Sequence, residues 1–138
     1  MNAVDSSVAV AACASWHESH GVAQEAVARG TRLVAHAALE TFSVLTRLPA
    51  PHRVAAPIVA AFLDQAFADD PLTLDARALR ALVEDLARRG VAGGAVYDGL
   101  IARTAAAHGA TLLTLDRRAE DTYRRCGVRY RVLQARAD

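Results

Sequence analysis

Four acidic residues stand at the ends of predicted buried elements, although they lie far apart along the chain. They are Asp5, Glu40, Asp98 and Asp116. Brought together without a cation they would repel one another, by about 4 kcal/mol for two charges about 4 Å apart at an effective dielectric near 20. Oxygen ligands with no paired His or Cys select a hard ion, Mg²⁺ or Mn²⁺. Such an ion activates water and neutralises phosphate charge, so the set predicts hydrolysis of a phosphodiester.

Each acid also has a structural alternative. Asp5, Asp98 and Asp116 are each placed to cap a predicted helix, at 6–14, 98–108 and 117–126 respectively. The alternative for Glu40 is an exposed position on a helix, where most glutamates lie. The joint placement favours a shared site, because no single alternative predicts it.

The elements that must position these acids alternate between strands and helices. This alternation at short spacing predicts an α/β fold, a parallel sheet flanked by helices in three layers. Five strands are predicted, at 2–5, 31–35, 71–75, 111–115 and 129–133. Helices are predicted at 6–14, 17–29, 36–48, from Pro57 onward, 76–90, 98–108 and 117–126.

Apolar spacing indicates which helix faces point inward. In the helix at 36–48 the inward positions are Leu39, Phe42 and Leu45 or Leu48. The helix that begins near Pro57 has Ile58, Phe62, Leu63 and Ala66 as its stripe. The helix at 76–90 has Leu79, Leu82, Val83 and Leu86.

Ligands of parallel α/β sheets bind outside the carboxyl ends of the strands. Asp5 ends the first predicted strand and Asp116 ends the fourth. Asp98 opens a helix that starts on the same edge if Gly109 turns the chain back into the fourth strand. Glu40 follows the second strand on that side. We therefore expect the four carboxylates to converge.

Composition restricts the classes of function. The chain has 138 residues, enough for one domain, with 53% hydrophobic residues and a net charge of +1, which predicts no non-specific binding to nucleic acid or membrane. All 16 basic residues are arginine. The absence of lysine excludes a G-x-x-x-x-G-K phosphate loop, a Schiff-base enzyme and a receiver domain. Ser7 stands where an aspartyl-phosphate phosphatase needs its second acid, and there is no G-x-S-x-G elbow.

The cysteines and the N-terminus indicate the compartment. Cys13 and Cys126 are far apart and form no C-x-x-C pair, so two free thiols in a reducing compartment are expected. The first ten residues have no basic region, and Asp5 interrupts what would be the apolar core of a signal peptide. No apolar run approaches the length of a membrane span. A cytoplasmic protein without membrane association is predicted.

Three segments resemble one family. "VDSSV" near the N-terminus, "LETFSVLTRLP" and "YDGLIARTAAAHGATLLTLD" are similar to PIN-domain ribonucleases, specifically VapC-type toxins of bacterial toxin–antitoxin pairs, and the likeness covers about residues 2–133. The resemblance implies a single PIN domain over 1–138 with a five-stranded parallel sheet. It also implies a Mg²⁺ or Mn²⁺ cofactor, endonucleolytic cleavage of RNA, a homodimer, and inhibition by a cognate antitoxin.

The resemblance carries over to individual residues. It implies that Asp5, Asp98 and Asp116 ligate the metal, and that Glu40 either ligates it or holds and deprotonates the attacking water. Ser6 and Thr114 match positions where the family often has a hydroxyl beside the acids.

The chain departs from the family pattern after Asp116. Some members have a further acid there, whereas this chain has Arg117 and Arg118, which favours one metal ion over two. These arginines either bind RNA phosphate as bidentate forks or form a solvated helix face. Two other functions remain open. One is a non-catalytic PIN-like module that binds RNA or protein. The other is cleavage of single-stranded or flapped DNA, since the metal acts on the phosphate, which RNA and DNA share.

Overall fold

A four-stranded parallel sheet forms the centre of the molecule. The computed structural model describes residues 1–134, so the last four residues of the expected domain lie outside the described part. The sheet has the order β2-β1-β3-β4. Its strands are β1 (Asn2–Val4), β2 (Arg32–Leu33), β3 (Thr111–Thr114) and β4 (Tyr130–Val132).

The two central strands are buried on both faces. Val4 of β1 pairs with Leu33 of β2 and Leu113 of β3, and Thr114 at the end of β3 pairs with Val132 of β4. Val4 and Leu113 are at most 1% exposed. Burial of both faces explains why the adjacent positions 3–4 and 112–113 are all apolar instead of alternating with polar residues. It also means that Asp5 and Asp116, which follow β1 and β3, leave the sheet at one edge.

The prediction of five strands is wrong, because the segment 71–75 forms only a single parallel bridge. Leu72 pairs with Val34: the Leu72 amide donates to the Leu33 carbonyl at 2.8 Å, and the Ala35 amide donates to the Leu72 carbonyl at 2.9 Å. Pro71 has no amide hydrogen with which to extend the ladder. On the other side Asp75 already caps the next helix, so the extended segment ends there.

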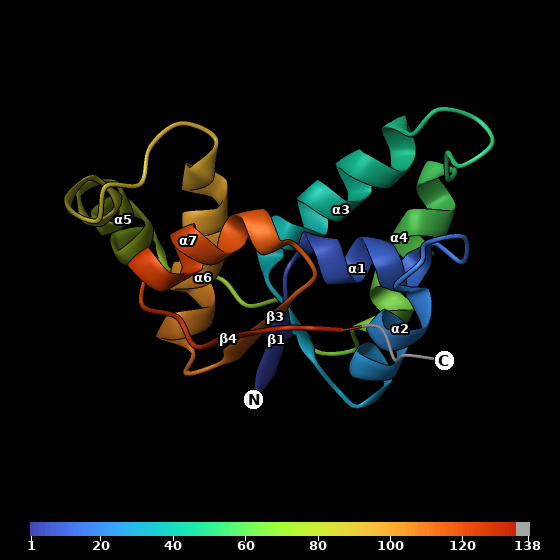
Figure 1. Ribbon diagram of the computed structural model, residues 1–138, viewed down its shortest axis with the longest axis horizontal. Coiled ribbons are helices and arrows are strands. Elements are labelled where there is room, and N and C mark those ends of the chain that lie inside the picture. The colour runs from blue at the N-terminus through green and yellow to red at the C-terminus, as the bar shows by residue number, and fades with distance from the viewer. Residues whose placement is uncertain (135–138) are drawn as a thin grey trace.

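Helices lie on either side of the strands, with α1 to α4 on one side and α5 to α7 on the other (Figure 1). Their bounds are α1 (Ser6–Cys13), α2 (His20–Ala28), α3 (Ala35–Arg47), α4 (Ala56–Ala66), α5 (Ala76–Arg88), α6 (Ala95–Ala107) and α7 (Glu120–Arg125), the last preceded by the 3-10 turn η1 (Arg117–Ala119). Every predicted helix is present, and α/β architecture with helices around a parallel sheet is confirmed. Within residues 1–134 no helix is both long and apolar enough to cross a membrane.

The start of α6 differs from the prediction by one turn. It begins at Ala95 instead of Asp98, because Gly94 already has helical backbone angles (φ −61°, ψ −26°). At the other end Gly109, with φ +66°, turns the chain from α6 back into β3. The Ala110 amide then donates to the Ala105 carbonyl at 3.0 Å and closes this helix end, as expected where glycine adopts the left-handed conformation.

The predicted inward faces are too wide. In α5, Leu82 and Leu86 are buried, but Leu79 and Val83 are 49% and 74% exposed. Leu39 of α3 and Ile58 of α4 are likewise exposed, whereas Leu45 and Val59 are buried. Each of these helices contacts the rest of the fold along a narrow stripe of its surface. Side chains next to that stripe therefore remain exposed to solvent.

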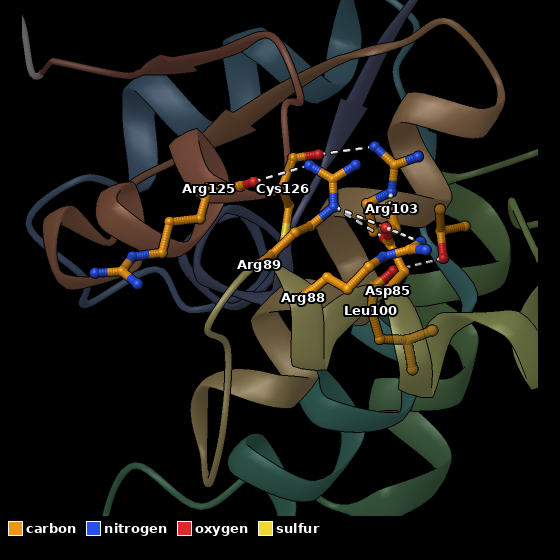
Figure 2. Close-up of polar contacts among 8 residues, drawn as sticks. Asp85, Arg88, Arg89, Leu100, Arg103, Arg125 and Cys126 are labelled. Carbon is orange, nitrogen blue, oxygen red and sulfur yellow. Dashed lines mark hydrogen bonds and ion pairs between the residues drawn. The ribbon is translucent and has the colours of Figure 1, made fainter.

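An arginine network joins α5, α6 and α7 (Figure 2). Asp85 on α5 lies 3.0 Å from Arg89 and 3.4 Å from Arg103 of α6. The Arg89 guanidinium also donates to the Arg125 carbonyl at 2.9 Å, and the Arg103 guanidinium donates to the Cys126 carbonyl at 2.8 Å. Carbonyls at the C-terminus of α7 thereby accept hydrogen bonds from cationic groups. The C-terminus of a helix is a favourable place for positive charge.

Candidate active site

Asp5 is a buried carboxylate surrounded by hydrogen-bond donors. It directly follows β1 and is 2% exposed. The Ser7 hydroxyl and the Val8 amide, the latter at 3.3 Å, donate to Oδ1, and the Tyr123 hydroxyl donates to Oδ2 at 2.7 Å. Asp5 is also the N-cap of α1, so the capping alternative is correct for this residue. Capping uses only part of its capacity to accept hydrogen bonds.

Burial and hydrogen bonding act on the charge of Asp5 in opposite directions. Burial raises the pKa of Asp5, while hydrogen bonds from Ser7, Thr114 and Tyr123 lower it, and the net direction is upward. The pKa of Tyr123 is also raised, first by burial and then by the neighbouring Asp5 carboxylate. Tyr123 therefore remains a hydrogen-bond donor to Asp5 throughout the neutral range.

Two hydroxyls connect the start of α1 to the end of β3. Ser7 Oγ accepts from the Leu115 amide at 2.8 Å and lies 3.4 Å from Thr114 Oγ1. Thr114 Oγ1, fully buried, accepts from the Asp116 amide at 3.0 Å. These contacts set the chain direction at Asp116 relative to Asp5.

Glu40 has an unsatisfied oxygen. It lies in the second turn of α3 and is half-buried. Its Oε1 is buried and accepts no hydrogen bond from any described residue. The pKa of Glu40 is raised by burial and by Asp5, and lowered by His36 and by a hydrogen bond from Ser6. A buried carboxylate oxygen without a partner is costly, and a bound cation or water would satisfy it.

Asp98 links the four acids. It lies in the first turn of α6 and does not cap it, since the helix begins three residues earlier. Burial, which is the largest cause, and repulsion from Glu40, Asp116 and Asp5 together raise the pKa of Asp98 to about 6. Four carboxylates from four different elements are therefore within electrostatic reach of one another, and we call them the acid site.

The acid site has the donor chemistry for a hard divalent cation. Within residues 1–134 no three His, Cys, Asp or Glu side chains have the arrangement of a formed metal cage. Mg²⁺ does not need one, because it is usually bound through one or two carboxylates and retains several waters. The unpartnered Glu40 oxygen and the repulsion at Asp98 are both conditions that such a cation would relieve.

Comparison with known proteins identifies the fold. The model of the PIN domain family matches residues 3–125. The chain belongs to the PIN domain family. It is 52% identical over 128 residues to "Ribonuclease VapC40" of Mycobacterium tuberculosis (strain H37Rv), covering 93% of this chain and 96% of the relative. It is 45% identical over 127 residues to "Ribonuclease VapC27" of the same strain, covering 91% and 92%. The predicted resemblance to VapC-type PIN domains is confirmed.

Arg117 and Arg118 stand beside the acid site of this PIN domain. Asp116 caps η1 by accepting from the Arg118 amide at 3.0 Å, and the Arg118 Nε lies 3.7 Å from the Asp116 carboxylate. The Arg117 guanidinium lies 3.9 Å from Glu120. The side chains of Arg117 and Arg118 are 66% and 97% exposed, so both guanidinium groups remain accessible to solvent.

Sequence reasoning missed two residues of the PIN-domain site. Ser7 donates to Asp5, while Ser6, the predicted supporting hydroxyl, lowers the pKa of Glu40 through a hydrogen bond. Tyr123 is separated from Asp5 by 118 positions, and its segment looks like an ordinary amphipathic helix. The available signal was a single large aromatic side chain on an otherwise polar helix, which indicates a buried position but not its partner.

Proposed function

We propose that the protein is a Mg²⁺- or Mn²⁺-dependent endoribonuclease of the VapC type, which hydrolyses phosphodiester bonds of RNA. The observation that carries this proposal is the acid site, in which the three other carboxylates repel the charge of Asp98 and help to raise its pKa. A purely structural role would not gather four carboxylates in one place, because each pair costs free energy unless a cation is present. The names of the two relatives, both ribonucleases, support the same activity.

Asp5, Asp98 and Asp116 would hold the metal, directly or through water. When bound, the ion supplies Lewis-acid stabilisation of the phosphate charge and lowers the pKa of a bound water. Asp5 is kept in place for this task by Tyr123 and Ser7. Asp116 is followed by Arg117 and Arg118 and not by a further acid, which favours one metal ion over two.

Glu40 is suited to orient the attacking water. Its unpartnered Oε1 is an acceptor, and its raised pKa makes it a better base than an ordinary glutamate. It takes the proton of the water while the oxygen bonds to phosphorus and the ribose oxygen leaves. Arg117 and Arg118, exposed beside Asp116, are placed to bind RNA phosphate as bidentate donors.

The partners follow from the family resemblance and the surface. A homodimer and a cognate antitoxin that inhibits the toxin are part of this proposal. Exposed apolar side chains on three helices support protein contacts, namely Leu39, Ile58, Leu79 and Val83. The two free cysteines suit a cytoplasmic location.

The test is cleavage of a mixed single-stranded RNA pool by antitoxin-free protein, with Mg²⁺, with Mn²⁺ and with EDTA. Cleavage is expected only with an ion, and Asp98→Asn is expected to abolish it without unfolding the protein. Glu84→Gln is the matched control, because Glu84 is an exposed acid on α5 outside the acid site.

Three results would contradict parts of this proposal. Cleavage that persists in EDTA, or that Asp98→Asn leaves intact, rules out this metal assignment. Absence of cleavage together with absence of any Mn²⁺ effect on the melting temperature favours the non-catalytic binding module. A parallel single-stranded DNA pool distinguishes RNA from DNA as the substrate.

A further inference from the structure

Two aromatic rings are stacked at the edge of the acid site. The rings of His36 and Tyr97 have centroids 5.3 Å apart and planes only 6° from parallel. His36 lies on α3, one turn before Glu40, and Tyr97 lies on α6, directly before Asp98. The two helices thus each contribute one carboxylate to the acid site and one ring to its border.

Tyr97 is not explained by core packing. It is 55% exposed, and its hydroxyl forms no hydrogen bond with any described residue. One face of the ring is set against His36, which is half-buried. An aromatic ring held in one orientation loses little conformational freedom when a ligand binds to it.

We propose that Tyr97, supported by His36, is a stacking platform for one unpaired nucleobase of the RNA. This inference rests on the proposed function and deepens it, because it states which part of the substrate contacts the border of the acid site. Bases stack on aromatic side chains without regard to sequence, since every base has a π face. The platform therefore contributes affinity for single-stranded RNA.

The charges around the platform favour a base over a phosphate. The neighbouring carboxylates, Glu40 and Asp98, repel a phosphate wherever no cation stands between them. A neutral base carries no such penalty. Because the ring adjoins Asp98 in the chain, the stacked base belongs to a nucleotide close to the scissile phosphate. A base inside a duplex is already stacked and paired, so the platform selects unpaired RNA.

The test measures binding without cleavage. In an Asp116→Asn background, fluorescence anisotropy with Mg²⁺ follows binding of a labelled single-stranded oligouridine of about twelve nucleotides. Tyr97→Ala is expected to weaken binding about tenfold, and Tyr97→Phe to retain it, because stacking needs the ring and not the hydroxyl. A base-free ribose-phosphate chain of the same length should bind the Tyr97 and Tyr97→Ala proteins equally. The oligouridine–oligoadenosine duplex should likewise lose nothing on Tyr97→Ala.

Trp16 provides a matched control. It is another exposed aromatic residue over a histidine, 47% exposed and with its ring centroid 4.3 Å from that of His52. It lies beyond the far end of α1 from Asp5, a helix of eight residues that spans about 12 Å. Trp16→Ala is expected to leave oligouridine binding unchanged.

Several results would overturn the platform. The first is equal binding of oligouridine by the Tyr97 and Tyr97→Ala proteins, and the second is an equal loss of affinity for the base-free chain in Tyr97→Ala. The third is an equal loss of oligouridine affinity in Trp16→Ala, and the fourth is no binding of oligouridine at all. Loss of self-association in Tyr97→Ala with unchanged RNA binding would instead assign the ring to a protein interface. Because binding is measured in a cleavage-deficient background, the platform is tested even if the nuclease proposal fails, and cleavage can persist even if the platform fails.

Discussion

At the residue scale, Asp5 depends on donors from the adjacent turn of α1 and from a distant part of the chain. Its two oxygens are held by Ser7 and the Val8 amide on one side and by Tyr123 on the other. A buried carboxylate needs such donors, since an unpaired buried charge costs several kcal/mol. Support of this kind is what gives a metal ligand a single orientation.

Tyr123→Phe is expected to lower both stability and cleavage. It removes one buried hydrogen bond to a charged group, which is worth about 2 kcal/mol of unfolding free energy. Loss of a residue that orients a metal ligand typically lowers activity about tenfold or more. Urea unfolding and a cleavage assay on the same preparation measure the two effects.

Tyr130→Phe is the control for that substitution. Its ring packs near that of Tyr123, with centroids 5.9 Å apart, but its hydroxyl donates to Glu120 at 3.1 Å in a half-buried position. We expect less than about 1 kcal/mol and normal cleavage. Equal losses in the two variants would contradict a specific role for the Tyr123–Asp5 contact.

The raised pKa of Asp98 makes stability depend on pH. Its pKa is about 6 in the folded protein against 3.8 for the ordinary carboxyl, so between these values the folded state binds more protons than the unfolded state. The contribution of Asp98 to stability therefore rises as the pH falls from about 6 toward 3.8, and above about 6 its charge is a net cost. Asp98→Asn should raise the melting temperature at neutral pH in EDTA and flatten its pH dependence in that window.

Thermal unfolding at neutral pH and at about pH 5, in the presence of EDTA, measures this effect. Glu84→Gln, for which the charge change is outside the acid site, should leave the pH profile as it is. An Asp98→Asn protein that is less stable than the original at neutral pH would show that the carboxylate is not under repulsion.

At the element scale, the position of α6 depends on contacts with α5 and α7. Gly99 of α6 faces Leu86 of α5, and a Cβ atom built at Gly99 would lie 2.6 Å from Leu86 Cδ2. The two helices approach closely there. The arginine network of Figure 2 joins the same helices. Since Asp98 and Tyr97 are in the first turn of α6, these contacts place both residues at the acid site.

Asp85→Ala tests the network. Burial raises the pKa of Asp85, but hydrogen bonding and charge from Arg89, with Arg103, outweigh it and lower the pKa overall. Removing the carboxylate leaves the guanidinium groups of Arg88, Arg89 and Arg103 without this anion, so we expect a loss of about 1–2 kcal/mol in urea unfolding. The control is Asp121→Ala, whose pair with Arg125 is exposed and should contribute less than about 0.5 kcal/mol. Equal effects would mean that the network adds nothing beyond a surface ion pair.

At the scale of the whole molecule, the acid site should couple metal binding to folding. A cation that binds only the folded protein stabilises it by about 2.7 kcal/mol at a concentration one hundred times its dissociation constant. Mn²⁺ or Mg²⁺ should therefore raise the melting temperature, and EDTA should reverse the rise. The shift should shrink in Asp98→Asn and persist in Glu84→Gln. An unchanged melting temperature in all three proteins would argue against a cation site.

Local patterns predicted most of the fold. Positions 3–4 and 112–113 are apolar because both sheet faces are covered, and glycine at 109 ends α6 because it alone tolerates the left-handed conformation there at no cost. The prediction failed at two places, for a local reason at the segment 71–75 and for a packing reason at α5. Leu72 forms a single bridge because Pro71 and the Asp75 cap limit its segment, and Leu79 is exposed because α5 touches its neighbours along a narrow line.

By itself the sequence determined the α/β class, the order of the helices and the identity of the four acids, because each depends on residue type and on spacing within one element. Only the tertiary structure decided which groups meet. The partners Tyr123 and Asp5 are 118 positions apart, and the stacked rings of His36 and Tyr97 come from two different helices. Contacts of this kind depend on how whole elements pack, and nothing in the local sequence of either partner specifies the other.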